Sequence, residues 1–197
     1  MKKLFAVITV AIVCHLSPNV YAQADASLIT QFLDQSKAAG DSQLAGIATE
    51  LTDKIKTFGA SLAGNAAVKE KLDDVLKSLT GGEDSAALTS AFKLATAAKF
   101  TPEQTDLARQ VGNVASAYVV QKNFASLAGA QGDVATVVSS LRAGNLTSAI
   151  APLKNIASNN HLTDGQKQLV SVLTDKYAPG LKKAAGALDG IKKLPGF

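Results

Sequence analysis

His161 is the one histidine that could take part in chemistry once an N-terminal signal peptide has been removed. It stands two residues before Thr163, where a helix is expected to begin, so it belongs to a turn. A general base needs a partner, and a zinc site needs three or four ligands from His, Cys or carboxylate side chains. Because the only cysteine, Cys14, lies in the signal peptide, the sequence predicts no metal site, no cofactor and no thiol chemistry.

Adjacent carboxylates are the next candidates, since two carboxylates facing each other across a cleft can hydrolyse a glycosidic bond. The candidates are Asp73-Asp74 and Glu83-Asp84. Asp73 stands four residues before Lys77, and Glu50 stands four residues before Lys54, which is the spacing of ion pairs on an exposed helix face. Glu83-Asp84 has the position of a helix start. The sequence therefore predicts a protein that is not an enzyme, with no catalytic residue.

Positive charge gathers near the C-terminus, where five lysines and a single acid lie between Lys176 and Phe197. On a helix over 180–193, Lys182, Lys183 and Lys193 lie opposite the apolar face. These three lysines are the only candidate contact residues, for an anionic membrane surface or an acidic partner. The alternative is a solvated outer face whose lysines oppose the helix dipole.

The first 22 residues have the three parts of a bacterial-type export signal. Lys2 and Lys3 precede an apolar run over 4–13, and small residues follow it, so we expect cleavage after Ala22 or Ala24. The run is too short for a spanning helix, which needs about 20 apolar residues. A lipoprotein anchored through Cys14 is the other alternative, but the residues before this cysteine do not fit that processing. The sequence thus predicts a periplasmic or secreted protein.

Removal of residues 1–22 leaves 18 basic residues against 16 acidic ones, a net charge of +2. Only Arg109 and Arg142 are arginines, and there is no tryptophan, so the clustered cations and stacking aromatics of nucleic-acid binders are missing. Apolar residues make up 47% of the chain and aromatics only 5%, so the core must consist of Leu, Val, Ile and Ala. About 175 residues can bury such a core without disulfides.

Apolar residues recur at steps of three and four almost throughout, which indicates amphipathic helices and no sheet. We expect an all-α fold, a bundle or short α-solenoid of about nine helices in a single domain over 23–197. Their expected ranges are 25–39, 42–58, 66–79, 84–99, 102–124, 132–142, 147–158, 164–177 and 180–193. Val119-Val120 and Val137-Val138 are β-branched pairs that favour strands, but both lie within helical spacing.

Helix starts carry capping signals. Thr101 with Gln104, and Thr163 with Gln166, have the spacing of a capping box. Four aspartates also stand at the start of apolar periodic segments, where a carboxylate can accept backbone N–H groups. They are Asp25, Asp41, Asp84 and Asp133.

An internal repeat is indicated by a shift of 62 residues, which aligns the two capping boxes and matches Gly82 with Gly144. A nearby register of 65 pairs the pentapeptide 60–64 with the identical 125–129. The possible units are 41–99, 102–160 and a partial copy over 163–193; chance similarity between Ala- and Leu-rich helices is the alternative. A structural repeat predicts two pairs of equivalent, buried leucines, namely Leu79 with Leu141 and Leu107 with Leu169.

Repeats of helices commonly present binding surfaces. Together with the missing catalytic parts, this favours an exported, non-catalytic helical protein that binds or scaffolds a macromolecule, most simply another protein. The alternative is a carrier that holds a small apolar ligand or lipid between its helices. Neither interpretation involves nucleic acid, or an integral membrane segment after cleavage.

Overall fold

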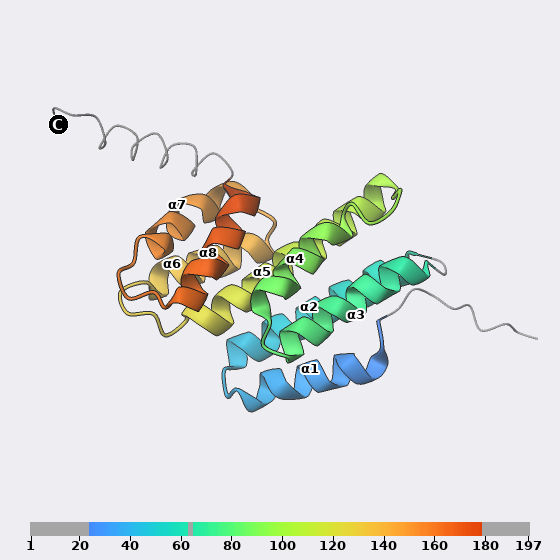
Figure 1. The fold of residues 1–197 in the computed structure, drawn as a ribbon, viewed down its shortest axis with the longest axis horizontal. Helices are drawn as coiled ribbons and strands as arrows, with labels where there is room; N and C mark the ends of the chain where they lie inside the picture. Colours follow the sequence, from blue (N-terminus) through green and yellow to red (C-terminus); the bar gives the residue numbers. More distant parts are fainter. Residues whose placement is uncertain (1–23, 63–64, 179–197) are drawn as a thin grey trace, which may run out of the picture.

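Eight α-helices form the part of the chain that the computed structural model describes, residues 24–62 and 65–178 (Figure 1). They are α1 (Ala26–Ala38), α2 (Ser42–Ala60), α3 (Ala66–Thr80), α4 (Asp84–Leu94), α5 (Pro102–Phe124), α6 (Gln131–Arg142), α7 (Leu146–Ala157) and α8 (Asp164–Tyr177). No β-strand occurs in these two segments, so the all-α prediction is confirmed. The expected ninth helix, 180–193, lies outside the described residues. No helix within them has the length and apolar content needed to cross a membrane.

The helix that departs most from its predicted range is α4, which ends at Leu94 and not at residue 99. After Leu94 the α-helical hydrogen bonds are replaced by tighter turns, because the N–H groups of Thr96 and Ala97 donate to carbonyls three residues back and not four. Phe100 then packs against Phe58 of α2, with ring centroids 5.6 Å apart. The two valine pairs that favour strands are helical, in α5 and α6.

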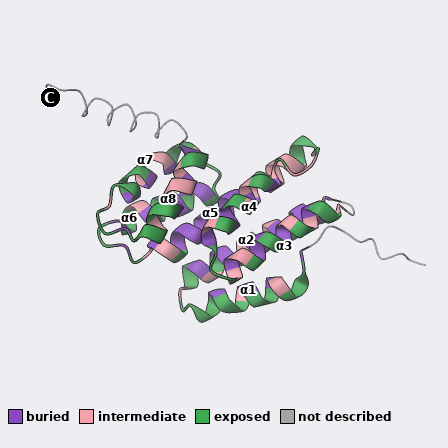
Figure 2. Ribbon diagram, in the orientation of Figure 1, coloured by how far each residue is buried: buried purple, intermediate pink, exposed green. Residues whose placement is uncertain are grey.

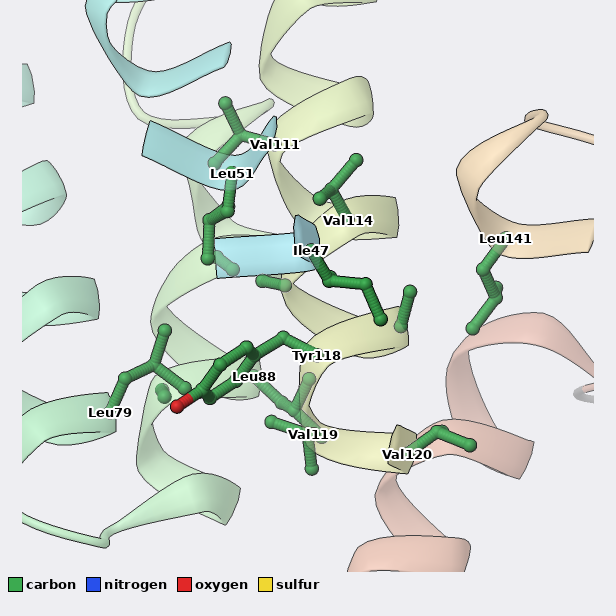
Figure 3. Packing of buried hydrophobic residues seen from close by; sticks show 14 of the residues in the cluster. Ile47, Leu51, Leu79, Leu88, Val111, Val114, Tyr118, Val119, Val120 and Leu141 are labelled. Atoms are coloured by element: carbon green, nitrogen blue, oxygen red, sulfur yellow. The ribbon is translucent and has the colours of Figure 1, made fainter. Parts of the chain in front are cut away.

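The centre of the fold is α5, which contacts α2, α4, α6 and α8. Every residue from Val111 to Gln121 is buried, whereas most of the first nine residues of α5 are exposed or half-buried, and Figure 2 shows buried residues along the central part of this helix. A helix that is buried all round has lost the polar face of an ordinary surface helix. Val111, Val114 and Tyr118 pack with Ile47 and Leu51 of α2 in the core (Figure 3).

Two of the four predicted aspartate caps are present. Asp25 Oδ1 accepts from the N–H of Ser27 (2.8 Å), and Asp41 Oδ1 accepts from two N–H groups at the start of α2. Asp84 and Asp133 do lie in the first turns of α4 and α6, but the predicted capping hydrogen bonds are wrong, because both side chains bond to other helices. The N-cap of α4 is Glu83, while the buried Asp84 accepts from Lys122 Nζ (2.9 Å) on α5. Asp133 accepts from Asn155 of α7 instead of capping α6.

Both predicted ion pairs along helix faces are also wrong. Glu50 accepts from Arg142 Nε at 2.7 Å, a residue 92 positions away, and Lys54 donates to Gln110 of α5. Asp73 is buried and accepts from Lys69 Nζ (2.6 Å), one turn before it, and from the backbone N–H of Asp25 (2.7 Å). These side chains connect helices that lie far apart in the sequence.

The two leucine pairs that the repeat predicts to be equivalent differ in their burial. Leu79 and Leu141 are both buried, as expected for equivalent positions. Leu169 is also buried, but Leu107 is only partly buried at the edge of the core. The prediction for Leu107 is wrong because it lies in the first turns of α5, before the fully buried stretch begins at Val111.

Candidate functional site

A groove of about 540 Å³ lies where α2, the first half of α5 and the turn between α6 and α7 meet. Three cations line it: Lys54 from α2, Arg109 from α5 and Arg142 from the last turn of α6. The only two arginines of the chain are therefore on one groove. The polar residues Asp106, Gln110 and Asn113 also line it.

The turn after α6 places Arg142 at the groove. Gly144 adopts φ of +70°, a conformation that favours glycine. The N–H of Asn145 can then donate to the carbonyl of Ser140 (2.9 Å) and close the end of α6. Asn145 caps the next helix, so α7 starts at once and its first residue, Leu146, lines the same groove.

The three cations of the groove have different hydrogen-bond and ion-pair partners. Lys54 Nζ donates to Gln110 Oε1 at 2.7 Å, and Arg142 pairs with Glu50. Arg109 pairs with Asp106, three residues before it on the same helix, and both side chains are largely exposed. Hydrogen bonds from Arg109 and then from Gln110 hold the pKa of the Asp106 carboxyl below its usual value, so this acid stays ionised.

An apolar pocket of about 230 Å³ adjoins the groove and lies between α4, α5 and α8. Its walls include the rings of Phe92 and Tyr177, which meet edge to face with centroids 5.7 Å apart. Small residues from α4, its C-cap and α5 also line it, namely Ala91, Ala95, Ala108 and Gly112. Arg109, Asn113 and Leu146 line both the groove and the pocket, so the two spaces lie next to each other.

A buried polar cluster forms one wall of the pocket. Tyr177 Oη donates to Asn113 Oδ1 (3.1 Å) and lies 2.9 Å from Ser116 Oγ, which donates to the carbonyl of Gly112. Burial raises the pKa of the Tyr177 hydroxyl well above its usual value. This hydroxyl is therefore neutral at physiological pH and acts as a fixed hydrogen-bond donor, not as a base.

The Asn113 amide is oriented by the same cluster. Its oxygen is occupied as the acceptor for Tyr177, so its Nδ2 points the other way. Asn113 lines both spaces, and within the described segments Nδ2 makes no hydrogen bond. A donor of this kind can bind an oxygen of a ligand.

The arrangement is suited to binding. His161 is exposed in the turn before α8, as expected. In residues 24–62 and 65–178 no three His, Cys, Asp or Glu side chains are placed to hold a metal ion. The groove and pocket instead combine guanidinium and ammonium groups with an apolar recess, which suits a ligand with an anionic and an apolar part.

The predicted contact residues Lys182, Lys183 and Lys193 lie outside the described residues. The groove and the pocket have no signal in the sequence beyond the fact that Arg109 and Arg142 are its only arginines. Their distance along the chain gives no sign that they meet. Phe92 and Tyr177 belong to different helices, and each fits an ordinary apolar helix face.

The chain matches no protein-family description, no curated protein and no solved structure.

Proposed function

We propose that this chain is an exported, non-catalytic helical carrier that binds a small amphiphilic ligand in the groove and the adjoining pocket. The observation that carries the proposal is that Arg109 and Asn113 line both spaces, so polar and apolar recognition meet at one place. The groove, of about 540 Å³, lies within the range of roughly 300–1,000 Å³ typical of small-molecule sites. This geometry favours a small ligand over the macromolecular partner that the repeat suggests.

Export is part of the proposal and rests on the sequence pattern of residues 1–22. The structure is compatible with cleavage close to this point, since Ala24 is already buried and the N–H of Asp25 bonds to Asp73. Intact-mass analysis of the extracytoplasmic protein tests it. We expect a product that starts at Gln23 or Asp25 without lipid, and a mass matching acylated Cys14 would contradict this.

Native mass spectrometry of the protein purified from its producing cells tests the carrier function. We expect the wild type to retain a small molecule, and Ala95→Phe to lose it because the new ring occupies the pocket that Ala95 lines. Circular dichroism checks that the variant is folded. A wild type that carries no small molecule would contradict the proposal, as would an Ala95→Phe variant that retains the same one.

A scaffold for a macromolecule is the second candidate, and it rests on the repeat. Gln104 Nε2 donates to the carbonyl of Ser61 (2.7 Å), and Gln166 Nε2 donates to that of Asn123 (2.6 Å). Both bonds span 43 residues and are related by the shift of 62. These bonds support units that run from α2 to α4 and from α5 to α7, with α8 starting a third.

The ends of α3 and α6 support the same units. Gly82 and Gly144 have φ of +77° and +70°, and the residue after each donates to a carbonyl five positions back. Since α3 has 15 residues and α6 has 12, the difference of three accounts for the two registers of 62 and 65. The unequal burial of Leu107 and Leu169 speaks against full equivalence.

Affinity capture with the mature protein separates the two candidates when it is combined with native mass spectrometry. A scaffold should capture one protein in fixed stoichiometry and carry no small molecule. A carrier should give the reverse result.

A further inference from the structure

We propose that the ligand is a small carboxylate whose single apolar group, about the size of one aromatic ring, fills the pocket between α4, α5 and α8. Its carboxylate lies between Arg109 and Asn113. The inference rests on the proposed carrier function and names the chemistry of what is carried.

Charge is the first argument. The described residues hold 14 basic and 15 acidic side chains, so this body is close to neutral. Four of those cations line the groove and pocket, namely Lys54, Arg109, Arg142 and Lys176, whereas Asp106 is the only acid that lines either space. Even with Glu50 counted beside Arg142, the two spaces carry a net positive charge. They therefore attract an anion.

Arg109 is the cation best placed to bind the carboxylate. Its side chain is 60% exposed, and its ion pair with Asp106 is a local contact between two exposed groups. Such exposed pairs add little to stability, so a ligand can compete for the guanidinium at little cost. A guanidinium holds a carboxylate through two parallel hydrogen bonds, which an ammonium group cannot do.

Asn113 supplies a second donor at the same point. Tyr177, which is itself bonded to Ser116, donates to Asn113 Oδ1 in a cluster that is almost entirely buried, so Nδ2 is fixed before a ligand arrives. A donor fixed in advance costs little entropy when it binds. A carboxylate bound by both Arg109 and Asn113 Nδ2 lies at the boundary between the groove and the pocket.

The volume and the lining of the pocket indicate the size and the aromatic character of the ligand's apolar group. A cavity of about 150 Å³ holds benzene, and this pocket has about 230 Å³. Phe92 and Tyr177 present aromatic surfaces to it, and aromatic pairs gain from edge-to-face and offset contacts. Lys176 is held over the Phe92 ring, with Nζ 5.1 Å from the centroid, and is a further cation at the pocket.

Calorimetric titration of the mature chain with two matched probes tests the inference. The probes are 3-phenylpropionate and the neutral 3-phenylpropionamide, which differ in charge but hardly in shape. We expect the carboxylate to bind at least tenfold more tightly than the amide. In NMR titrations, its addition should shift the side-chain amide signal of Asn113.

Four variants assign the result to the site. Arg109→Gln should bring the affinity for the carboxylate down to that for the amide. Arg109→Lys should lose much of the preference for the carboxylate over the amide, because an ammonium group cannot form the two parallel hydrogen bonds of a guanidinium. Ala95→Phe should abolish binding of both probes, and Ala95→Leu checks this with a smaller side chain. Lys167→Gln is the matched control. It removes an exposed ion pair of the same spacing, with Asp164, away from both spaces, and should change neither affinity.

The outcomes separate the inference from the carrier function. Equal binding of both probes by the wild type, or a carboxylate preference that survives Arg109→Gln, would overturn the carboxylate assignment. Failure of the wild type to bind either probe would overturn the ring-sized carboxylate as the ligand. The carrier function is decided separately, by whether the protein from its producing cells retains a small molecule.

Discussion

Asp41 joins two helices through one carboxylate. Its Oδ1 caps α2, and its Oδ2 accepts from Gln121 Nε2 (2.8 Å) in the buried stretch of α5. The hydrogen bond from Gln121, followed by those from the backbone of α2, lowers the pKa of Asp41. Because the folded protein favours the ionised form, Asp41 stabilises the fold above its unfolded pKa of about 3.9. That stability is lost as the pH falls through the lower, folded pKa.

Asp41→Ala should lower the free energy of unfolding at pH 7 by about 1–3 kcal/mol, since a cap is lost and Gln121 loses its partner. The difference from wild type should shrink below about pH 4, where Asp41 becomes protonated. Urea unfolding at pH 7 and pH 3 measures both values. Asp34→Ala, an exposed aspartate of α1, is the control and should change stability by less than about 0.5 kcal/mol. A difference that does not depend on pH would show that the charge of Asp41 contributes nothing.

Gln104 and Gln166 each complete a capping box and also donate to a backbone carbonyl at the C-terminal end of another helix, Ser61 after α2 and Asn123 in α5. Gln104→Ala and Gln166→Ala should therefore each cost about 1–2 kcal/mol, and the two costs should be similar. Chemical denaturation of the single variants measures them. Gln168→Ala on the exposed face of α8 is the matched control. Costs that differ by more than about 1 kcal/mol would mean that the two glutamines are not equivalent.

At the scale of the helix, a glycine lowers stability in the interior of a helix and favours the turn at a helix end. Gly46 is exposed in the interior of α2, and a Cβ there would contact nothing within 4 Å. Gly82 ends α3 with φ of +77°, a conformation that costs other residues about 1–2 kcal/mol. The first glycine weakens its helix, while the second allows the chain to turn.

Gly46→Ala should raise the free energy of unfolding by about 0.5–1 kcal/mol, because alanine is the better helix former. Gly82→Ala should lower it by about 1 kcal/mol or more, because the left-handed turn is retained at a steric cost. Thermal or urea unfolding of the two variants gives both signs. Stabilisation by Gly82→Ala would show that the turn between α3 and α4 does not require this backbone conformation.

At the scale of the whole molecule, α5 organises the packing. The core on either side of it includes Leu79 of α3 and Leu141 of α6, both almost fully buried. Leu107 is also part of α5 but is only partly buried at the edge of the core. The cost of removing a leucine should follow this burial.

Leu79→Ala and Leu141→Ala should each lower the free energy of unfolding by about 2–5 kcal/mol, because each leaves a cavity. Leu107→Ala should cost less than either, since less of its side chain leaves water on folding. Denaturant unfolding of the three variants gives the order. A Leu107→Ala variant as destabilised as the other two would mean that Leu107 is buried, as the repeat predicts.

The sequence by itself determined the helices and where they start. Both capping boxes occur where they were predicted, and α2, α5 and α8 begin at their predicted residues. The physical reason is range: helical hydrogen bonds and caps join residues within about four positions, so their signals lie side by side in the chain. The stretch 110–121 contains no charged residue, which is a further sequence signal for the buried part of α5.

Only the tertiary structure decided what the polar side chains do. Periodicity shows which face of a helix is apolar, but not which helix covers it. Glu50 pairs with Arg142 and not with Lys54, and the structure brings both arginines to one groove. The pocket likewise exists because α4, α5 and α8 meet at Phe92, Gly112 and Tyr177. The candidate site is made of contacts between helices far apart in the sequence, and such contacts depend on how the helices pack.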